Sequence, residues 1–238
     1  MSTKTRYDEK KKGMAPKHSP TNQRKFHGKS RRFRTGVKAA VFIGVAMIAL
    51  GAIYVLNTMN GPSASKNQVG TYTFTVGNLG PGEQAPPIKL QSTDGSNFDL
   101  SAQRGKTVLL FFQEGLACQP CWDQIKDIES NMKQFQALGI DTIVSITSDP
   151  LDALKQKVAD EGLSTPILYD PNLAVSRTYD ANKYGMMGES SDGHTFIVVG
   201  PDGRIRWRAD FGGAPNYTMY VPISTLIADM KEGLNGKV

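Results

Sequence analysis

The sequence predicts an α/β domain, a mixed sheet flanked by helices, that follows one N-terminal transmembrane helix. Three observations predict it: an early uncharged apolar run, a later alternation of short apolar runs with amphipathic segments, and a closing hairpin pattern. The chain has 238 residues, of which 39% are hydrophobic. This length accommodates one packed domain of ordinary size together with additional segments.

Residues 1–36 read as a basic arm. The first 38 residues hold 13 of the 28 Lys and Arg residues but only Asp8 and Glu9 of the 22 acidic ones, so the rest of the chain is mildly acidic. The arm lacks apolar periodicity and is rich in Lys, Ser, Pro and Asn, which predicts disorder. Because its charge directly precedes an apolar run, we expect it to flank a membrane segment on the cytoplasmic side, with no nucleic-acid partner.

Residues 37–58 are predicted to form the transmembrane helix. The run from Ala39 to Leu56 has neither charge nor proline and is long enough to cross a bilayer. Positive flanks stay in the cytoplasm, which predicts a single-pass protein of the cell membrane with its C-terminal part outside the cytoplasm. The alternative is a cleaved signal peptide, but the basic leader and the apolar run are both longer than such peptides usually have.

Residues 59–69 are predicted to be a linker, and residues 70–236 the folded domain. The segment from Asn57 to Gly82 is rich in Gly, Ser, Asn and Thr, the composition of a flexible tether. Within it, Tyr72, Phe74 and Val76 alternate as a short half-buried strand would.

The first strong strand signal is the continuous apolar run Val108–Phe112, typical of a strand that is buried on both faces. A helix should follow the cysteines, because apolar residues recur there every three or four positions, and Gly139 can end it. These residues are Trp122, Ile125, Ile128, Met132, Phe135 and Leu138.

The alternation then repeats. We expect a strand at residues 142–146, and a helix that has Asp149 as its N-cap, Pro150 at its first position and its end near Gly162. Residues 166–169 predict a further short strand.

The last part of the domain predicts a hairpin and a covering helix. Residues 195–199 are an apolar run, and the turn residues 201–203 follow. Ile205 and Trp207 then alternate with arginines, which predicts Arg204, Arg206 and Arg208 on the solvent side. The amphipathic segment 223–230 should cover the sheet.

The cysteines carry the clearest chemical signal. Cys118-Gln-Pro-Cys121 contains both cysteines of the chain, at the junction of a predicted strand and helix. This spacing allows a reversible disulfide, and a helix N-terminus favours the nucleophilic thiolate. A purely stabilising disulfide is an alternative, but so short a loop constrains the unfolded chain little. A zinc site needs four ligands, and the domain offers one histidine and no further cysteine.

Several motifs resemble the redoxin group of the thioredoxin superfamily, which includes AhpC/TSA peroxiredoxins and membrane-tethered thioredoxin-like proteins. They are GEQAPP at 82–87, Asp94-Gly95, Leu100-Ser101, Arg104–Lys106, the cysteine motif, residues 145–150, Leu168–Pro171, Tyr179 and residues 196–203. The resemblance implies a thioredoxin-like fold and a thiol oxidoreductase without an organic cofactor. The implied partners are protein thiols and disulfides or peroxide, and an electron donor that lies outside the cytoplasm or in the membrane.

The two branches of this group imply different roles for the cysteines. In a thioredoxin-like reaction Cys118 attacks a partner disulfide and Cys121 resolves the mixed disulfide. In a peroxiredoxin-like reaction Cys121 takes the peroxidatic position, and Cys118 stands where that branch has threonine. Residues 192–196 contain neither the proline of the first branch nor the arginine of the second.

Two further side chains are candidates for the site. His194, the one histidine outside the basic arm, could tune a thiolate or accept a proton, or could be structural. Glu114 could accept a proton if it is buried, or could be a solvated loop carboxylate.

A copper-delivery protein of the Sco type is the alternative function. Cys118, Cys121 and His194 would be the copper ligands, and Met186 and Met187 add soft donors nearby in the sequence.

Overall fold

The structure is a computed structural model, and it describes residues 72–236. The predicted basic arm 1–36, transmembrane helix 37–58 and linker 59–69 therefore lie outside the described residues, as does the predicted domain start at residue 70. Between residues 72 and 236, no helix is long and apolar enough to cross a membrane.

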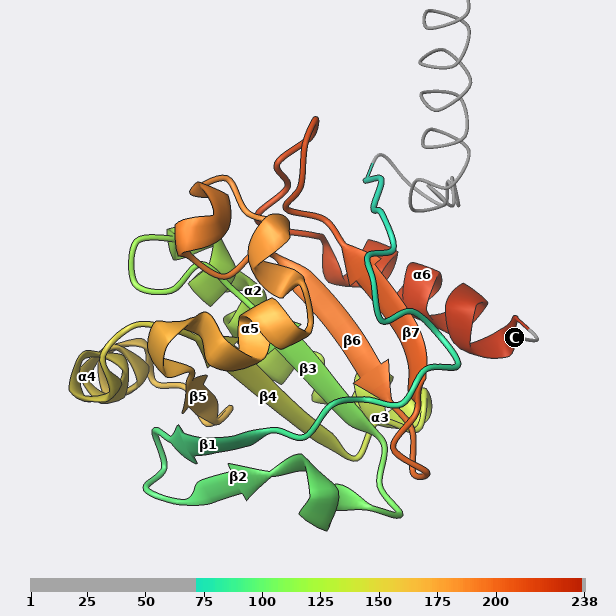
Figure 1. Cartoon of the computed structure of the whole chain (residues 1–238), viewed down its shortest axis with the longest axis horizontal. Coiled ribbons are helices and arrows are strands. Elements are labelled where there is room, and N and C mark those ends of the chain that lie inside the picture. Colours follow the sequence, from blue (N-terminus) through green and yellow to red (C-terminus); the bar gives the residue numbers. More distant parts are fainter. Residues whose placement is uncertain (1–71, 237–238) are drawn as a thin grey trace, which may run out of the picture. The chain divides into compact units, whose positions relative to one another are not determined.

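The described strands form one seven-stranded mixed sheet in the order β2-β1-β5-β4-β3-β6-β7 (Figure 1). The parallel centre pairs β3 with β4 and β4 with β5, and the other pairs are antiparallel. The strands are β1 (Lys89–Ser92), β2 (Asn97–Asp99), β3 (Val108–Phe112), β4 (Thr142–Thr147), β5 (Ile167–Tyr169), β6 (Thr195–Val199) and β7 (Ile205–Asp210). The predicted mixed α/β sheet is confirmed.

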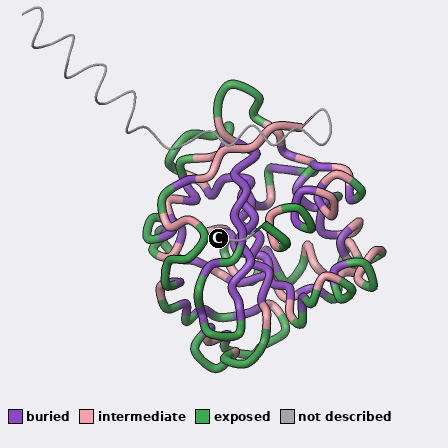
Figure 2. The backbone as a smooth tube through the Cα atoms, turned by 90° about the vertical axis from the view of Figure 1, so that its right-hand side faces the viewer, coloured by how far each residue is buried: buried purple, intermediate pink, exposed green. Residues whose placement is uncertain are grey.

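Strand β3 lies in the middle of the sheet because all five of its side chains are apolar and buried. Leu109 and Phe111 join the core on one face, and Val108, Leu110 and Phe112 join the core on the other. Figure 2 shows these buried segments running through the middle of the domain, with exposed loops around them. A strand that is apolar on both sides needs a cover on each face.

Helices cover both faces of the sheet. The first face packs against α2 (Gln119–Ser130), α3 (Met132–Ala137), α4 (Leu151–Glu161) and α6 (Ile223–Asn235), which contribute Trp122, Phe135, Leu154 and Leu226. The second face packs against the end of α5 (Ala174–Thr178) and the turn after it, through Tyr179 and Ala181. The apolar stripe expected after the cysteines is buried, but it belongs to two helices, because Asn131 caps α2 and begins α3.

Three local predictions need correction. Asp149 is not an N-cap: α4 begins after Pro150, and the Asp149 carboxylate accepts the Leu116 amide hydrogen bond instead. Residues 72–76 make one isolated bridge, Thr75 to Asp210, rather than a strand. The hairpin of β1 and β2, which has weak apolar alternation, was not predicted.

Arg208 is the main error of the predicted hairpin. Arg204 and Arg206 lie in exposed positions, but Arg208 is fully buried. The segment after residue 72 passes over β7 (Figure 1), and Asp210 on the same side of the strand binds Arg208 with an N–O distance of 2.9 Å. Apolar and polar residues do alternate along β7 as predicted. Both faces of the strand are covered at Arg208, however, so this polar side chain does not face solvent.

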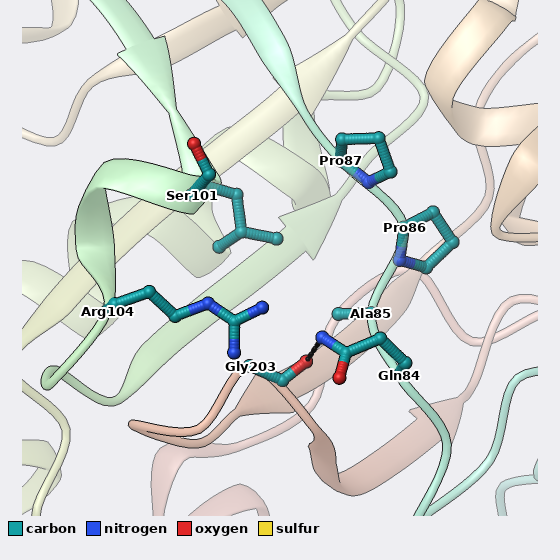
Figure 3. A pocket seen from close by; sticks show the side chains of 8 residues that line it. Gln84, Ala85, Pro86, Pro87, Ser101, Arg104 and Gly203 are labelled. Atoms are coloured by element: carbon teal, nitrogen blue, oxygen red, sulfur yellow. Dashed lines mark hydrogen bonds between the residues drawn. The ribbon is translucent and has the colours of Figure 1, made fainter.

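A pocket of about 260 Å³ lies at one end of β6 and β7 (Figure 3). It is lined by residues 84–87, by Leu100, Ser101 and Arg104, and by Gly203 in the turn before β7. The cysteines follow β3 at Phe112, which pairs with Thr195 at the opposite end of β6. The pocket and the cysteine pair therefore lie at opposite ends of the sheet.

Candidate active site

The cysteine pair lies at the edge of the sheet where the parallel strands β3, β4 and β5 end. Residues 113–118 follow β3, Asp149 lies in the loop after β4, and Asp170 follows β5. Carboxyl ends of parallel strands meet at one edge of a sheet, and sites in α/β folds form there. The strand-to-helix junction predicted for the motif is confirmed.

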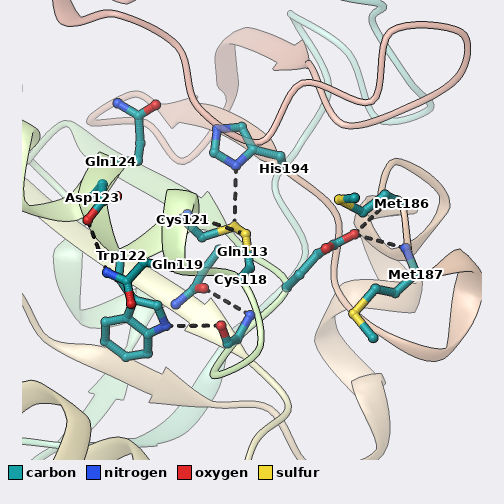
Figure 4. Close-up of a disulfide and its surroundings, with 12 residues drawn as sticks. Gln113, Cys118, Gln119, Cys121, Trp122, Asp123, Gln124, Met186, Met187 and His194 are labelled. Carbon is teal, nitrogen blue, oxygen red and sulfur yellow. Dashed lines mark hydrogen bonds between the residues drawn. A yellow bond between two sulfur atoms is a disulfide. The ribbon is translucent and has the colours of Figure 1, made fainter.

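Cys118 and Cys121 form a disulfide whose Cα atoms are 5.3 Å apart (Figure 4). Cys118 is the N-cap of α2, and its sulfur accepts a hydrogen bond from the Cys121 amide at 3.3 Å. Cys118 is 6% exposed and Cys121 is completely buried, and both pack against Met219. The amides at the start of this 12-residue helix favour negative charge on a nearby sulfur when the pair is reduced.

Gly115 shapes the loop that delivers Cys118. Its φ is +85°, and a Cβ there would lie 1.7 Å from the Asp149 carboxylate oxygen. The Gly115 carbonyl accepts hydrogen bonds from the Cys118 amide and from the Trp122 ring nitrogen, each at 3.0 Å. Asp149 in turn holds the Leu116 amide at 2.6 Å. Only glycine fits this close approach between the cysteine loop and the loop after β4.

His194 lies against the buried cysteine. Its Nδ1 is 3.8 Å from the Cys121 sulfur (Figure 4). Its ring packs edge-on against Phe111 and Phe196 at centroid distances of 4.9 and 5.3 Å. Complete burial lowers the pKa of His194 to about 3, because the charged ring would lose its hydration. At neutral pH the imidazole is therefore uncharged, and burial makes it a weaker base than a free histidine.

Glu114 is buried, with only 5% of its surface exposed, so the alternative of a solvated carboxylate is wrong. One of its carboxylate oxygens accepts hydrogen bonds from the amides of Met186 and Met187, the latter at 3.0 Å (Figure 4). Burial raises the pKa of Glu114, while the two amide hydrogen bonds act in the opposite direction. Glu114 thus joins the loop before the cysteines to the loop before His194.

The soft donors of the copper alternative are not gathered around the cysteines as a ligand set. Met186 and Met187 are 59% and 53% exposed. Across residues 72–236, no three or more His, Cys, Asp or Glu side chains form a group that could hold a metal ion.

Comparison with known proteins decides the family. The model of the AhpC/TSA family matches residues 81–208, which include the cysteine motif, His194 and the first four residues of β7. The chain belongs to the AhpC/TSA family. A relative from Mycobacterium tuberculosis that is named as a peroxiredoxin is 32% identical over 132 residues, covering 53% of this chain and 82% of that protein. The thiol-disulfide oxidoreductase ResA of Bacillus subtilis is 24% identical over 124 residues, covering 52% of this chain and 64% of that protein.

Solved structures share the fold of this AhpC/TSA chain. AhpC of Enterococcus faecalis superposes with a TM-score of 0.55 at 15% identity, covering 66% of this chain and 92% of that one. The peroxidoxin BcpB of Mycobacterium tuberculosis gives a TM-score of 0.53 at 18% identity, covering 65% and 97%. The thioredoxin-like fold and the redoxin resemblance are thereby confirmed.

The AhpC/TSA chain is therefore an oxidoreductase that acts on thiols or peroxides. None of the named relatives supports the copper-delivery alternative.

Sequence reasoning missed several residues of this region. Asp149 was assigned to its own helix, although the tight Gly115 turn signals that another group approaches there. Met219 packs on the disulfide from a loop a hundred residues away, and no local pattern indicates this. The buried carboxyl groups of Asp170 and Asp192 also escaped prediction.

Proposed function

We propose that the chain is a thiol-disulfide oxidoreductase in which Cys118 is the cysteine that exchanges with partners. The observation that carries this proposal is the unequal exposure of the pair: Cys118 reaches the surface, whereas Cys121 is completely buried behind it. A partner's sulfur has to approach in line with the sulfur under attack, so the exposed sulfur is the one a protein partner can reach.

The proposed cycle needs two steps. The Cys118 thiolate attacks one sulfur of a partner disulfide, so a mixed disulfide forms and the other partner sulfur leaves as a thiolate. Cys121 then loses its proton and attacks the Cys118 sulfur, which releases the second partner thiolate and closes the Cys118–Cys121 disulfide. Two electrons pass to the partner, and a dithiol donor restores the reduced pair by the reverse exchange.

His194 is proposed to stabilise the Cys121 thiolate. Its Nδ1 is the polar side-chain atom found in contact with that sulfur, at 3.8 Å, and the uncharged ring can donate an N–H hydrogen bond there. The proton that Cys121 loses is taken up by the partner thiolate released in the first step. Glu114 is proposed to hold the adjoining loops, since the Met186 and Met187 amides already occupy its carboxylate.

Peroxide reduction is the second candidate, and the 32% identity to a protein named as a peroxiredoxin favours it. Here the Cys121 thiolate takes one peroxide oxygen to become a sulfenic acid, and the peroxide's other oxygen leaves as an alcohol or water. Cys118 then displaces water from the sulfenic acid and forms the disulfide.

The proposed location is outside the cytoplasm, with the chain held in the cell membrane by residues 37–58. The uncharged run Ala39–Leu56 and the basic residues before it support this orientation. The proposed electron donor accordingly lies outside the cytoplasm or in the membrane.

One experiment separates the two activities. Full-length wild type, Cys118→Ser and Cys121→Ser are compared in detergent for reduction of a protein disulfide and for consumption of hydrogen peroxide, with dithiothreitol as donor. We expect disulfide reduction to dominate, and only Cys121→Ser to accumulate a covalent mixed disulfide with its partner. Peroxide consumption that survives in Cys118→Ser and is lost in Cys121→Ser would instead establish the peroxidase.

A further inference from the structure

Three polar side chains form a buried cluster beside the disulfide region. They are Asp170 after β5, Ser176 in α5 and Asp192 in the loop before β6, and none has any exposed surface. The Ser176 hydroxyl is 2.7 Å from Asp170 Oδ2 and is also hydrogen-bonded to Asp192 Oδ1. One hydroxyl thus bridges two buried carboxyl groups.

Counting hydrogens shows that the cluster holds an additional proton. A serine hydroxyl has one hydrogen and can donate it to only one carboxylate. The contact with the second carboxyl group then requires that this group carry a proton and donate it to the Ser176 oxygen. Two ionised carboxylates on one hydroxyl would leave a buried contact between an anion and an oxygen lone pair, which is strongly unfavourable.

The contacts assign the proton to Asp192. Asp170 accepts hydrogen bonds from the amides of Val175 at 3.0 Å and Ser176 at 2.8 Å in addition to the hydroxyl, which suits an anion. Asp192 has fewer such donors: besides Ser176 only the Ser148 backbone faces it among the described residues, and its Oδ2 has no hydrogen-bond partner there.

The charges around Asp192 point the same way. Burial raises the pKa of Asp192 well above its ordinary value, the contact with the Ser176 hydroxyl opposes this, and the carboxylates of Asp170 and Asp149 raise it further. The Ser148 backbone, which also faces Asp192, acts to lower the pKa.

Asp192 belongs to the segment that places His194. The Gly193 amide donates to the Ala181 carbonyl at 3.1 Å, and the His194 amide donates to the Tyr184 carbonyl at 2.8 Å. A Cβ on Gly193 would lie 2.2 Å from the Tyr184 oxygen, so the backbone here has no room to move toward that turn. The Asp192 side chain is the link from this segment to β5 and α5.

We propose that Asp192 is a positioning residue for the thiol chemistry: as a neutral carboxylic acid it donates to Ser176, Ser176 donates to Asp170, and this chain holds His194 against Cys121. The functional part of the proposal rests on the cysteine exchange proposed above. The protonation of Asp192 is tested independently of any activity.

The first test measures unfolding by urea between pH 4 and pH 9 for wild type, Asp192→Asn and Asp170→Asn. An amide replaces a carboxylic acid as a donor to Ser176, but it cannot replace an anion that accepts several N–H donors. We therefore expect Asp192→Asn to match or exceed the stability of wild type at pH 8, and Asp170→Asn to be strongly destabilised. Asp152→Asn, at a fully exposed side chain of α4, is the matched control and should change little.

The pH dependence follows from the raised pKa of Asp192. At a pH below the pKa that Asp192 has in the unfolded chain, the folded and unfolded states both carry its proton. Between that pKa and the higher pKa of Asp192 in the folded protein, only the folded state carries it. The folding equilibrium constant of wild type should therefore fall about tenfold per pH unit across this interval relative to that of Asp192→Asn, and the difference becomes constant above it. Equal destabilisation by both Asn variants, or the reverse order, would overturn the assignment of the proton.

The second test separates the two cysteines. Full-length reduced protein in detergent is mixed with the chromogenic disulfide 5,5′-dithiobis(2-nitrobenzoate), which releases one thiolate when Cys118 attacks and a second when Cys121 resolves the mixed disulfide. In Asp192→Ala we expect the first release to keep its rate and the second to slow by about tenfold or more. Asp192→Asn should restore the second rate.

Loss of both phases in proportion would mean only general damage, and an unchanged second phase in Asp192→Ala would exclude the positioning role. If the chain instead proves to be a peroxidase, the proposed function fails but this assay still measures how Asp192 acts on the pair.

Discussion

His194 shows how the surroundings of a single residue set its chemistry. The ring packs edge-on against two phenylalanine rings, Phe111 and Phe196, and its Nε2 has no hydrogen-bond partner among the described residues. Burial is the cause that acts on the ring and lowers its pKa to about 3. The result is a neutral imidazole beside the buried Cys121 sulfur throughout the physiological pH range.

We predict that the His194 ring will not titrate between pH 8 and pH 4 in the oxidised protein. Because the unfolded state gains the proton near pH 6.5 and the folded state only near 3, this residue's contribution to stability is complete above about pH 6.5 and is lost as the pH falls toward 3. NMR of labelled histidine measures this, and the urea-unfolded chain is the control, in which every histidine should titrate near about 6.5. A midpoint near that value in the folded protein would contradict the prediction.

Gly115 and Gly105 have similar backbone conformations, so substituting each of them in turn tests the packing of the cysteine loop. Both have φ near +85°, at +85° and +88°, but a Cβ on Gly115 would collide with Asp149 whereas a Cβ on Gly105 would meet nothing within 4 Å. Gly105→Ala should therefore cost only the left-handed backbone penalty of about 1 kcal/mol. Gly115→Ala should cost about 3 kcal/mol, because the collision adds to that penalty.

Urea unfolding of the two alanine variants gives both values under the same conditions. Equal losses would show that the contact between Gly115 and Asp149 is not as close as described.

At the scale of elements, strand β7 carries two arginines in opposite environments. Arg206 is exposed and pairs with Asp202, whereas Arg208 is buried and binds Asp210 and the Tyr179 carbonyl at 2.8 Å. Asp210 also accepts from the Thr195 hydroxyl at 2.8 Å, next to His194 in the sequence. This ion pair is therefore linked to the first residue of β6, the strand that directly follows His194.

We predict that Arg208→Met destabilises the fold by about 3 to 5 kcal/mol, because it leaves the Asp210 carboxylate buried without its partner. Arg206→Met, on the same strand, should cost less than about 1 kcal/mol, as exposed ion pairs do. Denaturant unfolding compares the two directly. Similar small losses would mean that solvent reaches Arg208.

Helix α2 places the cysteine pair at its N-terminus, where the proposed thiolate would be favoured. Cys118 caps the helix, Cys121 lies in its first turn, and Trp122 fixes the turn to Gly115. Spacing along the chain is enough to predict this arrangement, because the motif and its helix are contiguous.

At the scale of the whole molecule, the reactive edge of the sheet gathers loops that come from distant parts of the sequence. The loops after β3, β4 and β5 and the segment before β6 meet there, while the pocket of Figure 3 lies at the other end of β6.

The proposed tether predicts a definite topology. In cells whose outer permeability barrier has been opened, added protease should digest the domain from residue 70 onward and should leave an epitope at the N-terminus intact. Immunoblotting for both ends measures this, with a cytoplasmic protein as the control for cell integrity. Protection of the domain together with loss of the N-terminal epitope would reverse the proposed orientation.

The sequence by itself determined the features that depend on neighbours along the chain. The periodicity, composition and short spacing of the sequence predicted the apolar run of β3, the stripe of α2 and α3, the strands β4 to β7 and the closeness of Cys118 to Cys121. These patterns depend on which side chains of each segment pack into the core, and so they predicted the mixed α/β sheet.

Only the tertiary structure decided which polar groups are buried and which of them meet. Arg208 was predicted to face solvent and Asp149 to cap a helix, Glu114 was left open between a buried and a solvated carboxylate, and Asp192 had no predicted role. His194 and Cys121 are 73 positions apart, and their 3.8 Å contact arises because β3 and β6 pair in the sheet. A polar side chain can be buried only where other segments supply its hydrogen-bond partners. Neither the periodicity of apolar residues nor the spacing of motifs along one segment predicts which segments these are.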